Sequence, residues 1–308
     1  MKRFTDEPIL SLIDWIEQRK AQFPDGDVSF EIMSPSASFS ATPGKMVEAN
    51  GVRYIHRTYQ NVLDLAEVTR CRLKSVHPSG PWVQVVFTPT CETSQVRESN
   101  DSEKYGVQTA FAQIRKLEDP SVAADMRRAL VEAGVRTRNS LIDLGVNRGD
   151  ELQLVHELNP AMQCTGVDHC ASALDVARER FISQQFEFIE FDINRIDEMY
   201  LKRYDILFSL GTLHSPGIDS KRVFMWCVQH LLNPDGSVVI GFPNCRWVEG
   251  QPVYGGRTKN RREQDLSLVV KDVYFVKKYL QQHRFIVTVF GKYYLFVVGV
   301  KQKQGNVS

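Results

Sequence analysis

A carboxylate and two glycines follow an apolar run in LIDLGVNRGDEL, residues 141–152. The apolar residues before Gly145 predict a strand and those after Gly149 a helix, so both glycines lie in the connecting turn. Glycine in such a turn lets a ligand approach the backbone closely. A dinucleotide site uses three glycines spaced G-x-G-x-x-G, whereas Asn147 takes the middle place here and Asp143 would repel a pyrophosphate. These residues oppose a nicotinamide dinucleotide.

Two further carboxylates and a histidine follow later apolar segments. Asp168 ends GVD, about 25 positions after Asp143, close to the offset at which an acidic residue meets ribose hydroxyls. Asp192 ends EFD, and His214 follows YDILFSLG. Open α/β sheets bind ligands at the carboxyl ends of their parallel strands, so we expect these side chains at one edge. Asp168 and Asp192 have a structural alternative, because either can cap the next helix.

Strands and helices alternate through the last two-thirds of the chain. This alternation predicts a doubly wound α/β fold: a seven-stranded, mostly parallel sheet whose last strand is antiparallel. The expected strands are 139–145, 163–168, 186–192, 204–211, 237–242, 284–290 and 293–300, and the expected helices are 149–158, 172–181, 221–232 and 269–283.

The first part of the chain predicts a smaller α+β domain, residues 1–102. It opens with an amphipathic helix that places Ile9, Leu12, Ile13 and Ile16 on one face. Four strand-like segments follow, and the polar segment 88–104 predicts a linker with the domain boundary near Ser102. The second domain, 103–308, begins with two predicted helices, 105–117 and 121–134.

Composition and charge limit the classes of protein to which this chain can belong. The chain has 308 residues and a formal net charge of +1, which opposes a general preference for polyanions. None of its six cysteines forms a C-x-x-C pair and its histidines lack zinc spacing, so we expect no metal site. Neither a signal peptide nor a membrane span is expected. These features are typical of a cytoplasmic protein.

In their order along the chain, these motifs resemble those of the class I, Rossmann-like S-adenosylmethionine-dependent methyltransferases. IDLGVNRG is similar to the family's first motif, GVD to the end of its second strand, and EFDI to its third motif. YDILFSLGTLH is similar to the fourth strand, and LLNPDGSVVIGF to the following helix, turn and fifth strand. The resemblance implies S-adenosyl-L-methionine as the cofactor. The departure is Asn147, where many members have glycine.

The resemblance also implies roles for the residues at the strand ends. Asp143 would attract the ammonium of the methionine moiety, directly or through water. Asp168 would accept hydrogen bonds from both ribose hydroxyls, Asp192 would accept one from the adenine amino group, and Ile193 would pack on the ring. The predicted cofactor-binding residues are Asp143, Gly145, Asn147, Gly149, Asp168, His169, Asp192, Ile193, Ser209 and Leu210.

His214, in LGTLHSP, is the candidate catalytic base for a hydroxyl acceptor. Its alternative is a loop histidine that closes over the cofactor. GTLH lacks the N/D-P-P-Y/F run of methylases that act on amino groups of DNA bases. Cytosine C5 methylases use a cysteine nucleophile, but Cys245 lacks that family's other features and is better interpreted as a bystander thiol.

The connection 243–265 is long for its place in the chain and rich in basic and aromatic residues. Its arginines and lysine could bind a carboxylate, a phosphate or an RNA backbone, and its aromatic rings could stack on a base. The alternative, favoured for Arg261 and Arg262, is a solvated charge run. The predicted substrate-binding residues are Arg246, Trp247, Tyr254 and Arg257, with Lys259, Arg261 and Arg262 as further basic candidates.

The two helices in 103–138 resemble the lid that many small-molecule methyltransferases place over the cofactor, with Tyr105 and Phe111 lining it. This favours transfer of a methyl group to an oxygen or nitrogen atom of a metabolite. An RNA substrate, tRNA included, is the main alternative, although the N-terminal domain is slightly acidic. A nicotinamide dehydrogenase and a non-catalytic cofactor-binding protein stay open. The expected partner is a small molecule, with no membrane, and a homodimer is compatible with the sequence.

Overall fold

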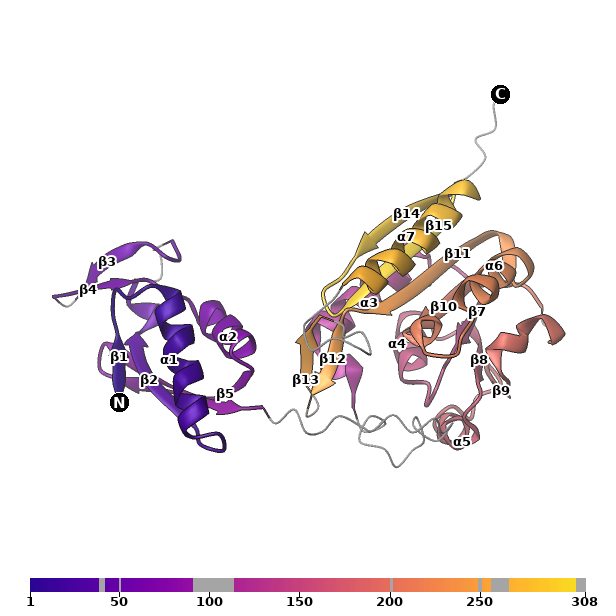
Figure 1. Cartoon of the computed structure of the whole chain (residues 1–308). Coiled ribbons are helices and arrows are strands. Elements are labelled where there is room, and N and C mark those ends of the chain that lie inside the picture. The colour runs from indigo at the N-terminus through magenta and orange to yellow at the C-terminus, as the bar shows by residue number, and fades with distance from the viewer. Residues whose placement is uncertain are drawn as a thin grey trace, which may run out of the picture. The chain divides into compact units, whose positions relative to one another are not determined.

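The computed structural model describes residues 1–38, 42–49, 51–90, 114–199, 202–248, 251–255 and 266–302. The chain divides into two compact units, Met1–Gln95 and Val96–Ser308. Figure 1 labels the elements of both. Within the described ranges, no helix has the length and apolar character needed to cross a membrane.

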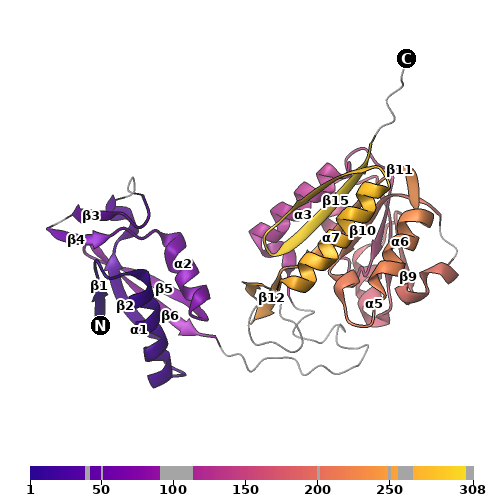
Figure 2. The ribbon, with the colours of Figure 1, turned by 45° about the horizontal axis from the view of Figure 1, so that its top comes forward.

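The N-terminal unit is a four-stranded sheet in the order β1-β2-β6-β5. The strands are β1 (Lys2–Phe4), β2 (Val28–Met33), β5 (Cys71–Ser79) and β6 (Trp82–Pro89), and β3 (Met46–Ala49) and β4 (Val52–Ile55) form a separate hairpin. The helices α1 (Ile9–Gln22) and α2 (Tyr59–Val68) belong to the same unit (Figure 2).

The core of this unit is aromatic at its centre. Phe30 meets Phe4 and Phe87 edge to face, at ring-centroid distances of 5.9 and 5.3 Å, an arrangement that aromatic pairs favour. Leu12 and Ile16 of α1 (Ile9–Gln22) are buried in the same core.

The second helix of the N-terminal unit, α2 (Tyr59–Val68), is absent from the sequence-based expectations. Residues 52–59 are expected as strand, but β4 ends at Ile55 and the helix begins at Tyr59. Thr58 and Asn61 form a capping box in which each side chain bonds the other's backbone N–H. This local signal could have revealed the helix.

The C-terminal unit contains a seven-stranded sheet in the order β14-β15-β11-β10-β7-β8-β9. All neighbours are parallel except β15, which is antiparallel to both β11 and β14. The fold class expected from the sequence is therefore confirmed. The strands are β7 (Ser140–Leu144), β8 (Gln163–Asp168), β9 (Phe186–Glu190), β10 (Tyr204–Leu210), β11 (Leu232–Pro243), β14 (Phe285–Phe290) and β15 (Tyr294–Lys301).

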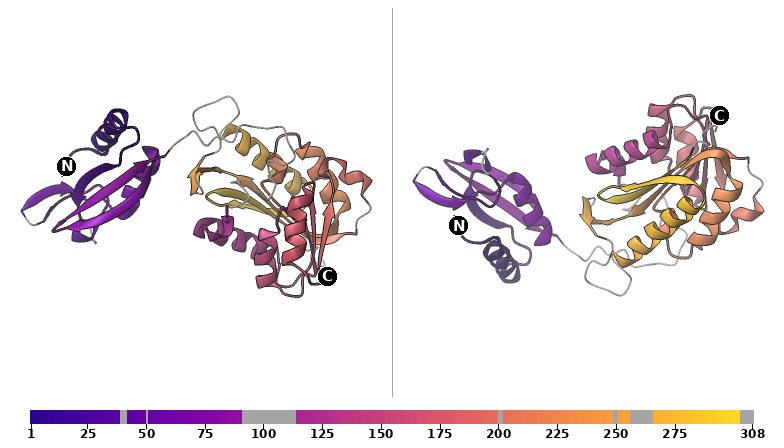
Figure 3. Two further views of the ribbon diagram at one scale, coloured as in Figure 1. Left: turned by 90° about the horizontal axis from the view of Figure 1, so that it is seen from below. Right: turned by 90° about the horizontal axis from the view of Figure 1, so that it is seen from above.

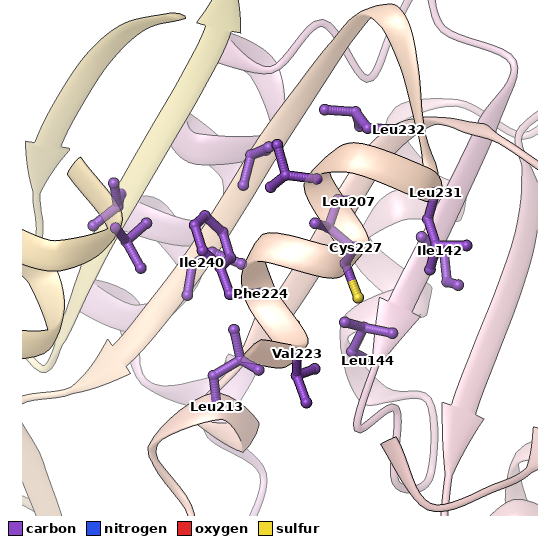
Figure 4. Packing of buried hydrophobic residues seen from close by; sticks show 14 of the residues in the cluster. Ile142, Leu144, Leu207, Leu213, Val223, Phe224, Cys227, Leu231, Leu232 and Ile240 are labelled. Atoms are coloured by element: carbon purple, nitrogen blue, oxygen red, sulfur yellow. The ribbon is translucent and has the colours of Figure 1, made fainter. Parts of the chain in front are cut away.

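Helices cover both faces of this sheet (Figure 3). The helices α3 (Pro120–Glu132), α4 (Asp150–Leu158) and α5 (Ala171–Arg180) contribute to one core cluster. The helices α6 (Ser220–His230) and α7 (Ser267–Gln282) contribute to the other. Figure 4 shows Val223, Phe224 and Cys227 of α6 against the sheet residues Leu207 and Ile240. The sandwich holds the strands rigid and leaves their carboxyl ends to carry a site.

The second of the two helices predicted to form a lid, α3, packs against the sheet instead. Val122, Met126, Ala129 and Leu130 of α3 are buried in a core cluster with sheet residues, and α3 packs along β15. The four apolar residues at helical spacing form one apolar face of α3, and this face is buried against the sheet. The first predicted helix, with Tyr105 and Phe111, lies mostly outside the described residues.

Candidate functional site

The carboxyl ends of β7 and β8 bring two of the predicted carboxylates onto adjacent strands. In the parallel register, Asp143 lies opposite Gly166, so Asp168 stands two residues further along the neighbouring strand. Asp168 is 7% exposed and Asp143 is 1% exposed. Both sit at the edge where open α/β sheets bind ligands.

The turn after β7 is tied to Asp168. One carboxylate oxygen of Asp168 accepts a hydrogen bond from the Asn147 backbone N–H at 2.8 Å, and the other accepts one from the Cys170 N–H at 2.9 Å. Asn147 has φ +47°, a left-handed conformation in which asparagine is enriched among non-glycine residues. This explains how Asn147 replaces the glycine found in many methyltransferases.

Gly145 and Gly149 are both required by the backbone. Their φ angles are +84° and +73°, and an added Cβ at Gly149 would lie 2.8 Å from Phe181. At Gly145 an added Cβ would lie 1.9 Å from Oγ1 of Thr212. Thr212 begins the short helix η6 (Thr212–His214), which follows β10. The contact therefore places η6 directly against the glycine turn.

Gly145→Ala is expected to destabilise the protein by about 3–5 kcal/mol, because left-handed strain adds to a clash with Thr212. Gly134→Ala is the matched control, since Gly134 has φ +87° but its added Cβ would come no closer than 3.6 Å to a neighbour. It should cost only about 1–2 kcal/mol. Chemical denaturation measures both. Equal costs would contradict the close contact between the turn and η6.

Asp143 carries a carboxylate oxygen that nothing in the described structure satisfies. Its Oδ2 atom is buried and has no hydrogen-bond partner among the described residues. Burial, reinforced by the neighbouring carboxylates of Glu151 and Asp168, raises the pKa of Asp143 well above its ordinary value, while Lys116 opposes the shift. An unpaired buried acceptor is costly, so a site of this kind suits a ligand that brings a donor.

The remaining residues predicted to bind the adenosine moiety have local roles. Asp192 caps the short helix η5 (Ile193–Glu198) by accepting a hydrogen bond from the Asn194 N–H at 2.9 Å. Its side chain is nevertheless exposed, whereas Ile193 is 5% exposed and belongs to a core cluster. His169 is exposed, with Nδ1 3.5 Å from Asp168. Their roles toward a ligand stay predictions.

Ser209 and Leu210, also predicted to bind the cofactor, have side chains that are enclosed in the fold. Ser209 is fully buried, and its hydroxyl donates a hydrogen bond to the Leu144 carbonyl at 2.9 Å, which links β10 to β7. Leu210 is 6% exposed and packs against Gly241 of β11. Consecutive strand residues point to opposite faces of a sheet that is covered on both sides, so both side chains are enclosed.

His214 has a partner that the sequence did not reveal. Its Nδ1 atom lies 2.9 Å from Oδ2 of Asp272, which comes from the first half of α7. Each side chain is 28% exposed. Because Asp272 occupies Nδ1, the imidazole is oriented and Nε2 is the nitrogen that can exchange a proton with a ligand. The arrangement is that of a general base with an orienting carboxylate.

The long connection after β11 contains a hairpin, β12 (Cys245–Val248) paired with β13 (Gln251–Tyr254). Arg246 and Trp247 are partly buried in β12, and Trp247 packs against the core cluster that contains Tyr294 of β15. Tyr254 is 38% exposed. The hairpin therefore supplies a wall beside the sheet edge.

The other predictions for this connection have mixed outcomes. Cys245 is 7% exposed, and burial raises the pKa of its thiol to about 12, which disfavours a nucleophilic thiolate and agrees with the bystander interpretation. The basic candidates Arg257, Lys259, Arg261 and Arg262 lie outside the described residues. Among the residues that the structure describes, no group of three or more His, Cys, Asp or Glu could hold a metal ion.

The chain was compared with known protein families and with curated proteins. A family described as "Methyltransferase domain" matches residues 137–281. No curated protein matches the chain.

Several solved structures are similar to this one. An S-adenosylmethionine-dependent methyltransferase from Mesorhizobium loti is 18% identical, with a TM-score of 0.44 over 60% of this chain and 100% of that one. A precorrin-6y methyltransferase from Geobacter metallireducens is 15% identical, with a TM-score of 0.40 over 59% and 88% of the chains. A magnesium protoporphyrin IX methyltransferase from Synechocystis, with S-adenosylmethionine bound, is 11% identical, with a TM-score of 0.40 over 58% and 77%.

The matched segment, 137–281, spans β7 to α7 and so includes the glycine turn, Asp168 and the His214–Asp272 pair. The strands β7 to β11 of this segment form the parallel part of the seven-stranded sheet, flanked by helices on both faces. The C-terminal unit thus contains a methyltransferase domain, matched over residues 137–281.

Proposed function

We propose that this protein transfers a methyl group from S-adenosylmethionine to an oxygen or nitrogen atom of a small molecule, with a hydroxyl as the favoured acceptor. The observation that carries the proposal is the His214–Asp272 pair on the segment that touches the glycine turn. A hydroxyl must lose its proton as it is methylated, and a histidine oriented by a carboxylate is suited to accept it.

The residues at the sheet edge fit the cofactor. Asp143 offers a buried, unsatisfied acceptor for the methionine ammonium. Asp168 accepts hydrogen bonds from the backbone N–H groups of Asn147 in the turn and of Cys170 after β8, and each carboxylate oxygen has a second acceptor site for a ribose hydroxyl. When bound, S-adenosylmethionine supplies an electrophilic methyl group on a sulfonium. Asp143 and the glycine turn would then fix the position of that group relative to His214.

In the proposed reaction His214 acts as the base. Asp272 accepts a hydrogen bond from Nδ1–H, which fixes the tautomer with a free lone pair on Nε2. Nε2 would take the proton of the acceptor hydroxyl as the oxygen forms its bond to the methyl carbon and the bond from that carbon to sulfur breaks, which leaves S-adenosylhomocysteine as the neutral leaving group. Asp272 stabilises the resulting imidazolium, which later returns the proton to solvent.

Three basic side chains near the glycine turn form ion pairs with carboxylates, which favours a small-molecule acceptor over RNA. Arg115 and Arg180 both pair with Asp150, at 3.4 and 2.5 Å, and Lys116 pairs with Glu151 at 3.8 Å. A polyanion is gripped by several available cations. The N-terminal unit has ten basic and eleven acidic residues, so its net charge also opposes RNA binding.

Cofactor affinity is expected to fall as the pH is lowered, because only ionised Asp143 attracts an ammonium. Burial beside Glu151 and Asp168 raises the pKa of Asp143, so its protonation begins at a higher pH than for an ordinary aspartate. Binding favours the deprotonated form, and affinity therefore rises with pH through this pKa and then levels. Calorimetric titration at several pH values measures it, and a pH-independent affinity would contradict the role of Asp143.

The proposal is tested with methyl-tritiated S-adenosylmethionine and an extract from cells that lack the gene. Label is counted separately in the small-molecule, RNA and protein fractions, with His214→Gln as the parallel variant. Label in small molecules, lost with the variant, supports the proposal. Label in RNA or protein would show that the methyl acceptor is a macromolecule and not a small molecule. Cofactor binding without transfer to any fraction would favour a non-catalytic role.

A further inference from the structure

The strand β14 (Phe285–Phe290) lies at one end of the seven-stranded sheet (Figure 1). Among the residues that the structure describes, β15 is the only strand that pairs with it. In an antiparallel ladder, every second residue of a strand directs its N–H and C=O groups away from a given neighbour. The outer side of β14 therefore presents a row of backbone donors and acceptors to which another extended strand can pair.

The side chains of β14 do not protect this edge. Its sequence, FIVTVF, contains no charged residue and no proline, the residues that commonly prevent an edge strand from pairing. β-Branched and aromatic side chains also favour strand pairing. Ile286 is 64% exposed and Val289 is 38% exposed, so apolar surface accompanies the backbone groups.

This apolar surface lies on both faces of β14. Val287 packs against the core cluster to which α6 and α7 contribute. Thr288 donates a hydrogen bond to Glu132 of α3 at 3.1 Å, on the other side of the sheet. Alternate residues of a strand point to opposite faces, so Val289 lies on the α7 face and Ile286 on the α3 face. A strand that joined this edge would cover both.

Exposed apolar residues of α7 flank the edge. The helix packs on β14 and β15, and its Phe275 contacts Phe224 of α6 at a ring-centroid distance of 6.3 Å. Val270 and Tyr274, about one helical turn apart, lie on the side of α7 away from Phe275. That side faces away from α6 and so toward the β14 edge. Val270 is 58% exposed and Tyr274 is 60% exposed.

The composition of β14 is compatible with pairing to an identical strand. A two-fold axis brings the same surface of both copies together, so a charged edge repels its own copy. Since β14 carries no charge, two copies of it meet without this repulsion. A stable dimer buries about 800 Å² on each copy, and the side chains of Val270 and Tyr274 add apolar area to that of the strand.

We propose that β14 pairs antiparallel with β14 of a second copy of this chain, around a two-fold axis that passes at Val287, so that the two sheets become continuous. This register places Val287 opposite the partner's Val287, and Phe285 opposite the partner's Val289. The inference goes beyond the proposed function and is independent of both the cofactor and the methyl acceptor.

The choice of Val287 follows from strand geometry. Residues that direct their backbone groups outward alternate along β14, so a two-fold antiparallel pairing has to be centred on a residue. Centring on Thr288 would place Phe285 opposite Gly291, which has no side chain to contact. Centring on Val287 gives each residue of the strand except Phe290 a strand residue opposite it, and these cross-strand pairs stabilise a sheet.

Sedimentation of the full chain tests the proposal. The unsubstituted protein should be a dimer at micromolar concentration. Ile286→Lys/Val289→Lys should raise the dissociation constant of the dimer at least about 100-fold, because the joined edge would bury unpaired charges. The matched control is Ile182→Lys, since Ile182 is 91% exposed outside the sheet, and it should remain dimeric. A monomeric unsubstituted protein, or an unchanged dissociation constant in the double variant, would overturn the inference.

Disulfide cross-linking tests the register without relying on the lysine variants. Val287→Cys should link two copies upon oxidation, because the two thiols would face each other at the axis. Thr288→Cys should react at least about 10-fold more slowly, since its two copies would be diagonal rather than directly opposite. The unsubstituted protein with the same oxidant reports any link through the native cysteines. Faster linking of Thr288→Cys, or no link in Val287→Cys, would contradict the proposed pairing.

Discussion

Asp143→Asn is expected to weaken S-adenosylmethionine binding by roughly 30- to 1000-fold, as truncation of a buried charge contact does. Asp143 is 1% exposed, and one of its carboxylate oxygens has no hydrogen-bond partner within the part of the chain that the structure describes. The asparagine keeps the size of the side chain but removes the charge that attracts the ammonium. Calorimetric titration of the purified protein measures the loss.

The same substitution is expected to leave the free protein at least as stable as before. Burial and the carboxylates of Glu151 and Asp168 disfavour the ionised form of Asp143. Removing that charge relieves the repulsion, so the free energy of unfolding near neutral pH should stay constant or rise. The sign follows from the raised pKa, because stability is lost as the pH rises through the folded-state pKa of such a group.

Asp175→Asn is the matched control. Asp175 is an exposed residue of α5 that pairs with Arg178 at 2.9 Å. Exposed pairs of this kind contribute little, so this variant should change neither cofactor affinity nor stability measurably. A marked loss of stability in Asp143→Asn with unchanged affinity would mean that Asp143 is a structural residue.

His214→Gln is expected to lower the rate of methyl transfer by about 10²- to 10⁴-fold, the range typical of removing a general base. Asp272→Asn should lower it as well, since an amide at Oδ2 favours the wrong tautomer of the imidazole. Affinity for S-adenosylmethionine should stay unchanged in both variants. The rate is measured as label transferred per minute into the small-molecule fraction.

His230→Gln serves as the control for the histidine series. His230 is an exposed residue at the end of α6, and its Nδ1 contacts the Trp226 carbonyl rather than a carboxylate. Transfer should proceed normally in this variant. Equal rates in His214→Gln and the unsubstituted protein would assign His214 to loop closure instead of catalysis.

The fold of the C-terminal unit was predictable because its signals are local. Apolar runs bounded by glycine, aspartate and asparagine specify β7, β8 and β10, and amphipathic spacing specifies α4 to α7. The expectations failed where a local signal was missed or where packing decided. Helix α2 had a capping box at Thr58, whereas α3 was assigned to a lid although its apolar stripe is buried on the sheet.

The candidate site also has a part that the sequence predicted and a part that it did not. Asp143, Gly145 and Asp168 lie on consecutive strands joined by one helix, so their types and spacing suffice to bring them together. Ser209 illustrates the limit, because a sequence indicates that a residue ends a strand but not whether its hydroxyl is used inside the sheet.

The sequence by itself therefore determined the order of the elements and the residues at the carboxyl ends of the first parallel strands. Only the tertiary structure decided which distant side chains meet there: Asp272 beside His214, 58 residues away, Thr212 against Gly145, and Lys116 beside Glu151. The reason is physical. Secondary structure follows from short-range periodicity, whereas these contacts depend on how whole helices pack onto the sheet, and no local pattern records that packing.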